Sequence, residues 1–91
     1  MLLVVVAGGC VSAPVQEMSD ARQAVEAAKA VNAPVKAPDA YNKATAHMRY
    51  AESALETGDY KDARAHATWA KTHALVARER ALARQPHLFG H

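Results

Sequence analysis

Histidine is the residue type in this chain with the widest chemistry, because a neutral imidazole can bind a metal ion or move a proton near neutral pH. The 91-residue sequence has five histidines, at positions 47, 66, 73, 87 and 91. His66 and His73 are seven residues apart. On a helix they share one face but lie about 10 Å apart along the axis. They cannot bind one ion without distortion of that helix.

A metal site shared between two helices is the alternative. His47 belongs to the preceding predicted helix, and packing of the two helices could bring it to His66 or to His73. His87 and His91 have the four-residue spacing of metal-binding helices, but Pro86 and Gly90 disfavour a helix there. We therefore interpret the histidines as residues at the edge of a helix–helix seam and in a tail. We predict no metal site and no cofactor.

The other reactive residue types form no catalytic set. Ser19 and Ser53 have no evident histidine and carboxylate partners, and the chain has no Gly-rich phosphate loop. Glu52 and Glu56 lie four residues apart, which we interpret as a solvated helix face. The formal charge of +2 is small and its signs are interspersed, unlike the basic face of a nucleic-acid-binding protein. We predict no enzymatic activity, no small-molecule substrate and no nucleic-acid partner.

Alanine spacing predicts the fold. Alanines recur at steps of three and four residues, the period of one helix face, at positions 63, 67, 70, 74, 77 and 81. We call this row the alanine seam. A face of methyl groups indicates a second helix packed very close against it. Large apolar side chains are few; those available for a core are Met18, Val25, Val31, Met48, Leu55, Trp69, Leu75, Val76 and Leu82. A core this small predicts association with a membrane, a partner or a second copy.

The sequence predicts an all-α domain of three helices, over about 14–31, 38–57 and 60–84. Pro34 and Pro38 forbid a continuous helix and so separate the first helix from the second. Gly58 suits a left-handed C-terminal cap, and Ser12 and Asp59 suit N-caps. The short link at Gly58 makes the second and third helices antiparallel neighbours joined by the seam. The first helix is expected to cover the groove between them.

The N-terminal segment has a pattern of its own. Residues 1–9 are apolar and end in small residues, and Ala7-Gly8-Gly9-Cys10 resembles the lipobox of bacterial lipoproteins. The resemblance implies that 1–9 is the remnant of a signal peptide and that Cys10 is lipidated. Residues 10–13 are then the lipidated cysteine and tether, 14–84 the helical module and 85–91 a loose tail. Val11, rather than Asp, after the cysteine favours the outer membrane, with the protein facing the periplasm.

The whole pattern resembles a known family. Ala37-Pro38-Asp39 is followed by alanines at 40 and 44, then by Gly58-Asp59-Tyr60 and the alanine seam. These features resemble the alanine-rich bacterial envelope lipoproteins of domain-of-unknown-function family 4398, over about residues 14–83. The second and third helices also resemble a single tetratricopeptide-like unit. The resemblance implies an envelope location and a helical fold, and it implies no activity.

These observations predict a non-enzymatic, lipid-anchored helical interaction or scaffold module of the cell envelope. Its predicted contact face consists of Trp69, His73, Val76, Arg80 and Tyr50, because exposed aromatic and arginine side chains are typical anchors of protein contacts. Burial of this face under the first helix is the alternative. Two other roles stay open: a structural lipoprotein close to peptidoglycan, and an unanchored helical module with a weak histidine metal site.

Overall fold

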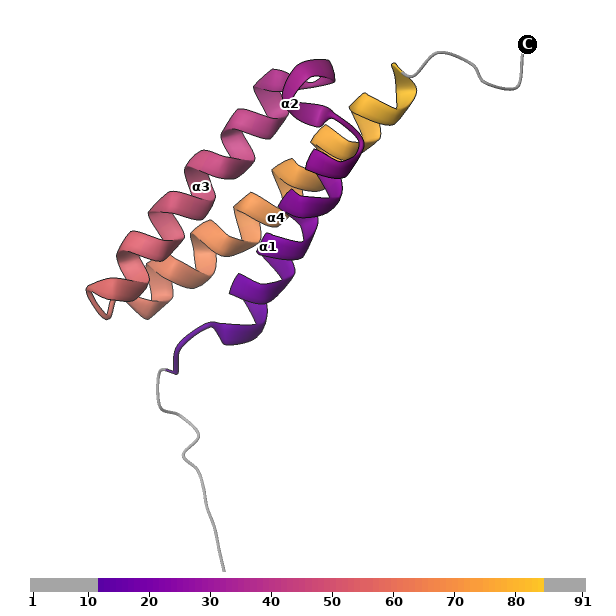
Figure 1. Ribbon diagram of the computed structural model, residues 1–91. Helices are drawn as coiled ribbons and strands as arrows, with labels where there is room; N and C mark the ends of the chain where they lie inside the picture. Colours follow the sequence, from indigo (N-terminus) through magenta and orange to yellow (C-terminus); the bar gives the residue numbers. More distant parts are fainter. Residues whose placement is uncertain (1–11, 85–91) are drawn as a thin grey trace, which may run out of the picture.

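The structure is a computed structural model, and it describes residues 12–84. Four helices follow one another: α1 (Val15–Ala30), α2 (Ala33–Lys36), α3 (Pro38–Glu56) and α4 (Tyr60–Ala83). Figure 1 shows α1, α3 and α4 as three long helices, with α2 at the end where α1 connects to α3. The predicted all-α architecture of three main helices is confirmed, and each predicted boundary lies within one residue of the observed one.

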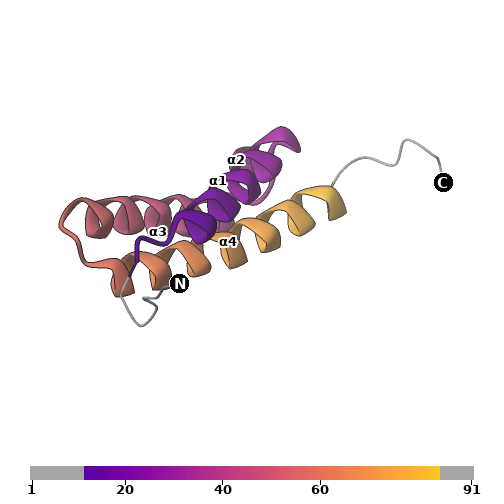
Figure 2. The same ribbon diagram turned by 90° about the horizontal axis from the view of Figure 1, so that it is seen from below.

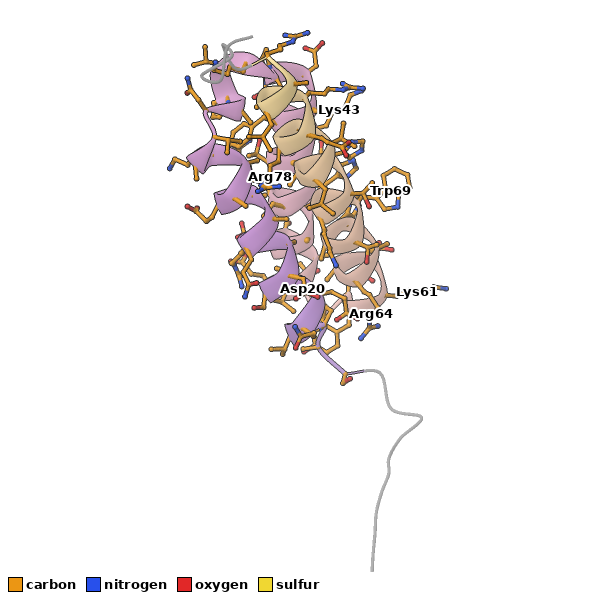
Figure 3. The ribbon with its side chains drawn as sticks, turned by 90° about the vertical axis from the view of Figure 1, so that its right-hand side faces the viewer. Asp20, Lys43, Lys61, Arg64, Trp69 and Arg78 are labelled. Atoms are coloured by element: carbon orange, nitrogen blue, oxygen red, sulfur yellow. The ribbon has the colours of Figure 1, made fainter. Side chains whose placement is uncertain are left out.

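The α3–α4 pair is antiparallel and makes the most extensive contact, followed by α1 with α4. In two views at right angles, α1 lies beside α4 (Figures 1 and 2). The predicted covering of the hairpin by the first helix is therefore confirmed, with most of its contact on α4 rather than on α3. The side of α4 that carries Trp69 is left open (Figure 3).

Alanine makes up almost the whole core. The buried apolar residues of the described chain are fourteen alanines, the two methionines Met18 and Met48, and Pro14. All six alanines of the seam have no exposed surface. The seam alanines from Ala67 to Ala81 pack against three groups outside α4: Met18, Ala21, Met48 and Ala51 at one end, Ala24 and Ala44 in the middle, and Ala28, Ala33, Ala37 and Ala40 at the other end. The predicted close-packed seam is confirmed.

Most large apolar side chains lie outside this core. Trp69, Leu75 and Leu82 are exposed, and Val25, Val31, Leu55 and Val76 pack only partly against the core clusters. Our interpretation of Trp69, Leu75 and Leu82 as available core residues was therefore wrong. The reason is geometric: helices that approach each other over methyl groups leave no room between them for a larger side chain.

The turn between α3 and α4 has the predicted cap. Gly58 has a φ of +80°, in the left-handed region that glycine enters without steric cost. Its N–H donates to the carbonyl of Leu55, and the N–H of Asp59 donates to the carbonyl of Ala54 at 2.8 Å. These two bonds form a Schellman motif, which satisfies the last carbonyls of α3 and reverses the chain.

Of the two predicted N-caps, Asp59 is confirmed in position and Ser12 is wrong. Asp59 occupies the N-cap position of α4, but its side chain makes no capping hydrogen bond. Pro14, not Ser12, precedes α1, and the carbonyl of Ser12 instead accepts a hydrogen bond from Arg64. The predicted break between the first and second helices is present, but it contains the short helix α2, which we had not predicted. Asn32 in the left-handed conformation (φ 65°) starts that helix.

Arg64 in α4 and Arg84 directly after α4 bind the segments that flank the hairpin. The Arg64 guanidinium donates to the carboxylate of Glu17 at 3.3 Å and to the Ser12 carbonyl at 3.1 Å, which joins the start of α1 to α4. The Arg84 guanidinium donates to the carbonyl of Lys36 at 2.8 Å, which joins the end of α2 to α4. Because the core contributes little area per residue, these directional contacts at both ends help to fix the packing of α1 and α2.

The seam gives a direct test. Replacing the fully buried Ala70 by leucine inserts three carbons between α4 and its neighbours, so we expect a loss of about 1–3 kcal/mol in the free energy of unfolding. Urea unfolding monitored by circular dichroism measures it. Ala65→Leu is the matched control, since Ala65 is exposed on the same helix. Equal stability of the two variants would contradict the placement of the seam.

Candidate functional site: an imidazole cluster beside an exposed tryptophan

Three of the histidines meet on the outer edge of the α3–α4 hairpin. His47 comes from α3, and His66 and His73 come from α4; we call these three the imidazole cluster. Each is partly buried, because it lies at the border of the seam beside a buried neighbour: Met48 for His47, Ala67 for His66 and Ala74 for His73. His47 is the centre, since it contacts both of the others. Both pairings that the sequence left open are therefore present.

The contact between His47 and His66 is a hydrogen bond. Their Nδ1 atoms are 3.0 Å apart, and the ring planes differ by 27°. The ring centroids are 5.2 Å apart. This is close to the largest centroid separation that two imidazoles can have when their Nδ1 atoms are 3.0 Å apart. The two nitrogens therefore face each other on the line between the rings. One ring donates its Nδ1–H and the other accepts through its Nδ1 lone pair.

His73 meets His47 in a different way. Its ring lies nearly parallel to that of His47, with an angle of 4° between the planes and 5.4 Å between the centroids. His73 therefore stacks on His47, whereas His66 is hydrogen-bonded to His47. Since the two α4 histidines occupy different sides of His47, their seven-residue separation does not prevent both from contacting it.

Aromatic rings surround the cluster. Trp69 meets His47 edge to face, with 5.1 Å between centroids, and Tyr50 lies 6.2 Å from His47 and 5.3 Å from His66. Both are exposed, Trp69 by 57% and Tyr50 by 58%. Trp69 projects away from the helices on the side opposite α1 (Figure 3). The alternative that the first helix buries Trp69 is wrong.

The predicted contact face is thus partly assembled. Trp69, His73 and Tyr50 all lie around His47. Val76 packs against the core near Val31 and Tyr41, and Arg80 is exposed further along α4. From the sequence, His47 was a candidate metal ligand within reach of His66 or His73, and all three were interpreted as residues at the edge of the seam. His47 contacts both α4 histidines because the helix register places it between them. The signal in the sequence is that His66 and His73 lie on either side of Ala70 at a spacing of seven residues.

The electrostatics of the cluster favour the neutral form of His47. The pKa of His47 is lowered from its ordinary value of 6.5, first by burial and then by the neighbouring charges of His66 and His73 when these are protonated. No salt bridge within residues 12–84 involves a histidine, so no carboxylate offsets that effect. His47 therefore acts in the cluster as a hydrogen-bonding and stacking group that is held toward its neutral form.

The same geometry is unfavourable for metal binding. A bound ion must lie about 2.0–2.1 Å from each nitrogen, at a point toward which both lone pairs are directed. The Nδ1 atoms of His47 and His66 are directed at each other instead, 3.0 Å apart. Across residues 12–84, no group of three or more His, Cys, Asp and Glu side chains is arranged to hold a metal ion. His87, His91 and Cys10 lie outside the described residues.

Away from the cluster, the described chain has a pocket lined by α1, α3 and the segment before α1. A shallow pocket of about 130 Å³ lies at the start of α1, far smaller than the roughly 300–1,000 Å³ of ordinary ligand sites. Its lining is mainly apolar and consists of Ala13, Pro14, Val15, Met18, Arg22 and Leu55. Of α1 to α4, none combines the length and the apolar character needed to cross a membrane.

Comparison with known proteins gives one match. The family model described as "Domain of unknown function (DUF4398)" matches residues 16–86, most of the chain and all of α2, α3 and α4. The matched range contains the alanine seam, the Gly58 turn, the imidazole cluster and Trp69. No curated protein and no solved structure matches the chain significantly.

Metal addition tests the interpretation of the cluster. We expect Zn²⁺ or Ni²⁺ to leave the melting temperature unchanged, because binding must break the Nδ1–Nδ1 bond and reorient both rings. Thermal unfolding with and without metal, followed by circular dichroism, measures this. A rise in melting temperature that His66→Asn abolishes would establish a site between His47 and His66 instead.

Proposed function

This chain belongs to the DUF4398 family of domains of unknown function, and from that premise we propose that it is a lipid-anchored protein of the bacterial cell envelope whose helical module binds another protein or a second copy of itself. The module acts without catalysis. It holds its partner on the outer edge of the α3–α4 hairpin, while Cys10 fixes the chain to the outer membrane on the periplasmic side.

The observation that carries the binding role is the exposure of Trp69. It is the single tryptophan of the chain, yet more than half of its surface is open to solvent. Tryptophan is one of the commonest anchors of protein–protein contacts, because it contributes a large apolar area and one hydrogen-bond donor. A core built from alanine and methionine does not need it, so its retention on the surface supports a role in binding.

Tyr50 extends the same surface. It is exposed on α3 and, like Trp69, contacts the ring of His47, so both aromatic rings border the imidazole cluster. The imidazoles beside them offer hydrogen-bond donors and acceptors. Exposed aromatic rings next to hydrogen-bonding groups suit a protein partner better than a phosphate or a nucleic acid, each of which requires concentrated positive charge.

The envelope location is supported by the sequence at Cys10. The chain has one cysteine, and it directly follows small residues at the end of an apolar run. Residues 1–11 lie outside the described part, which begins three residues before α1. A lipid on Cys10 would therefore place the start of α1, and the Arg64 contacts that fix it, close to the membrane surface.

Lipid labelling tests the anchor. In bacteria that express the full chain, we expect labelled palmitate to enter the wild-type protein and to be absent from Cys10→Ser, because the thiol is the acceptor of the lipid. Globomycin should cause the unprocessed form to accumulate. Ser12→Ala is the control and keeps its label. Equal labelling of Cys10→Ser would contradict the anchor.

Cross-linking tests the contact face. A photoreactive phenylalanine analogue at position 50 should give a discrete adduct in intact cells, and Trp69→Ala should reduce its yield at least about tenfold, as removal of an anchoring aromatic does. The same analogue at exposed Val35 on α2 should give no such adduct. Circular dichroism should show unchanged helicity, since Trp69 lies outside the core.

Two outcomes would count against this surface. An adduct of unchanged yield in Trp69→Ala would show that Trp69 is not an anchor. Loss of helicity in that variant would show that Trp69 supports the fold. An adduct with a second copy and an adduct with a different protein both support the contact face, and mass spectrometry of the adduct distinguishes them.

A further inference from the structure

The His47–His66 bond places a limit on the number of protons that the pair can hold. With both rings neutral, one Nδ1–H is donated across the 3.0 Å gap. A first added proton can enter at the outer Nε2 of the donor ring, which leaves the bond in place and makes it charge-assisted. A second added proton must enter at the Nδ1 that accepts the bond. Two N–H donors would then face each other with no acceptor between them.

From this geometry we propose that His47 and His66 form a proton-operated latch across the outer edge of α3 and α4, which holds with one or no added proton and opens when the second is bound. The latch joins the two helices at the level of Trp69 and Tyr50. Opening turns both imidazoles away from each other and adds positive charge beside the two exposed aromatic rings.

The surroundings make the second proton costly. The titratable groups that face His47 are His66 and His73 on α4 and Tyr50 on its own helix. Lys43 and Asp62, both exposed, lie one turn along from His47 and His66 on their helices. α1 contributes no ring to the cluster. A third imidazole stacked on His47 adds repulsion when it is protonated, so the cluster as a whole resists full protonation.

The sign of the effect follows from the pKa of His47. Its folded pKa lies below the unfolded value of 6.5, through burial first and then the charges of His66 and His73. A histidine whose pKa is lower in the folded than in the unfolded state stabilises the fold fully at pH values above its unfolded-state pKa. That stability is lost as the pH falls through its folded-state pKa. The latch therefore closes near neutral pH and opens in mild acid.

The consequence for binding rests on the proposed contact face, whereas the latch itself is a property of the isolated chain. The ring of Trp69 packs edge to face against the ring of His47, with 5.1 Å between centroids. Reorientation of the His47 ring therefore changes the surface against which Trp69 packs. A partner that docks on Trp69 and Tyr50 would meet a neutral, ordered surface at neutral pH and a cationic, rearranged one in acid.

Nuclear magnetic resonance tests the latch directly. In the full ¹⁵N-labelled chain, a bond between two imidazole nitrogens gives a scalar coupling between His47 Nδ1 and His66 Nδ1. We expect this coupling at about pH 7.5 and its loss by about pH 5, on either side of the ordinary histidine pKa. His66→Asn removes it at both values, while His73→Asn keeps it at the higher pH. Absence of the coupling at about pH 7.5, or its persistence at about pH 5, would overturn the proposal.

A second measurement does not depend on detecting that coupling. The melting temperature of the wild-type chain should fall by several degrees more than that of His66→Asn between the same two pH values, because the variant has no bond to lose. The fluorescence of Trp69 should change over the same range in the wild type and not in His47→Asn. Equal acid sensitivity of wild type and His66→Asn would reject the latch. Because both readouts use the isolated chain, the contact face can fail its cross-linking test while the latch passes.

Discussion

Close approach of α4 to its two neighbours is the constraint on which the rest of this structure depends. One face of α4 consists of the methyl groups of the alanine seam, from Ala63 to Ala81, and every seam alanine is fully buried. Such a face brings helix axes toward the low end of the roughly 8–10 Å range. Each methyl contributes little burial energy, so the seam favours close packing over large buried area. α4, at 24 residues, contacts all the other helices and organises the domain.

A seam of this kind determines where large side chains lie. Leucine or tryptophan cannot enter between helices that are already in contact through methyl groups, so Trp69, Leu75 and Leu82 are exposed on α4. The two methionines that are buried lie near the Gly58 end of the bundle, where Met18 and Met48 pack with Ala51, Ala67 and Ala70. Methionine suits that irregular space because its chain is unbranched and flexible. The exposed aromatic surface and the alanine core thus have the same origin.

The sequence was sufficient to predict the parts of the fold that depend on the helical period of the alanines and on the reversal of the chain at Gly58. Alanine spacing predicted the seam, and Gly58 predicted the left-handed cap. Helix α2 was missed because four residues carry no period, and the left-handed Asn32 has no unique signal. The Arg64 and Arg84 contacts join residues about fifty positions apart, and long flexible side chains do not reveal such partners. The site was predicted only in part: the contact face placed Trp69, Tyr50 and His73 together, and His47 was expected to reach His66 or His73. That His47 contacts both of them depends on the helix register, which the structure supplies.

The seam and the imidazole cluster are physically connected. His47 precedes the buried Met48, and His66 precedes the buried Ala67, so both rings lie at the rim of the contact between α3 and α4. At a wider helix separation, two imidazoles at these positions would not reach each other. The alanines bring the backbones close enough for a direct Nδ1–Nδ1 bond at 3.0 Å. Any substitution that widens the seam beneath this level should therefore break the imidazole bond before it unfolds the helices, since that bond has a steep distance dependence and the helices retain their own backbone hydrogen bonds.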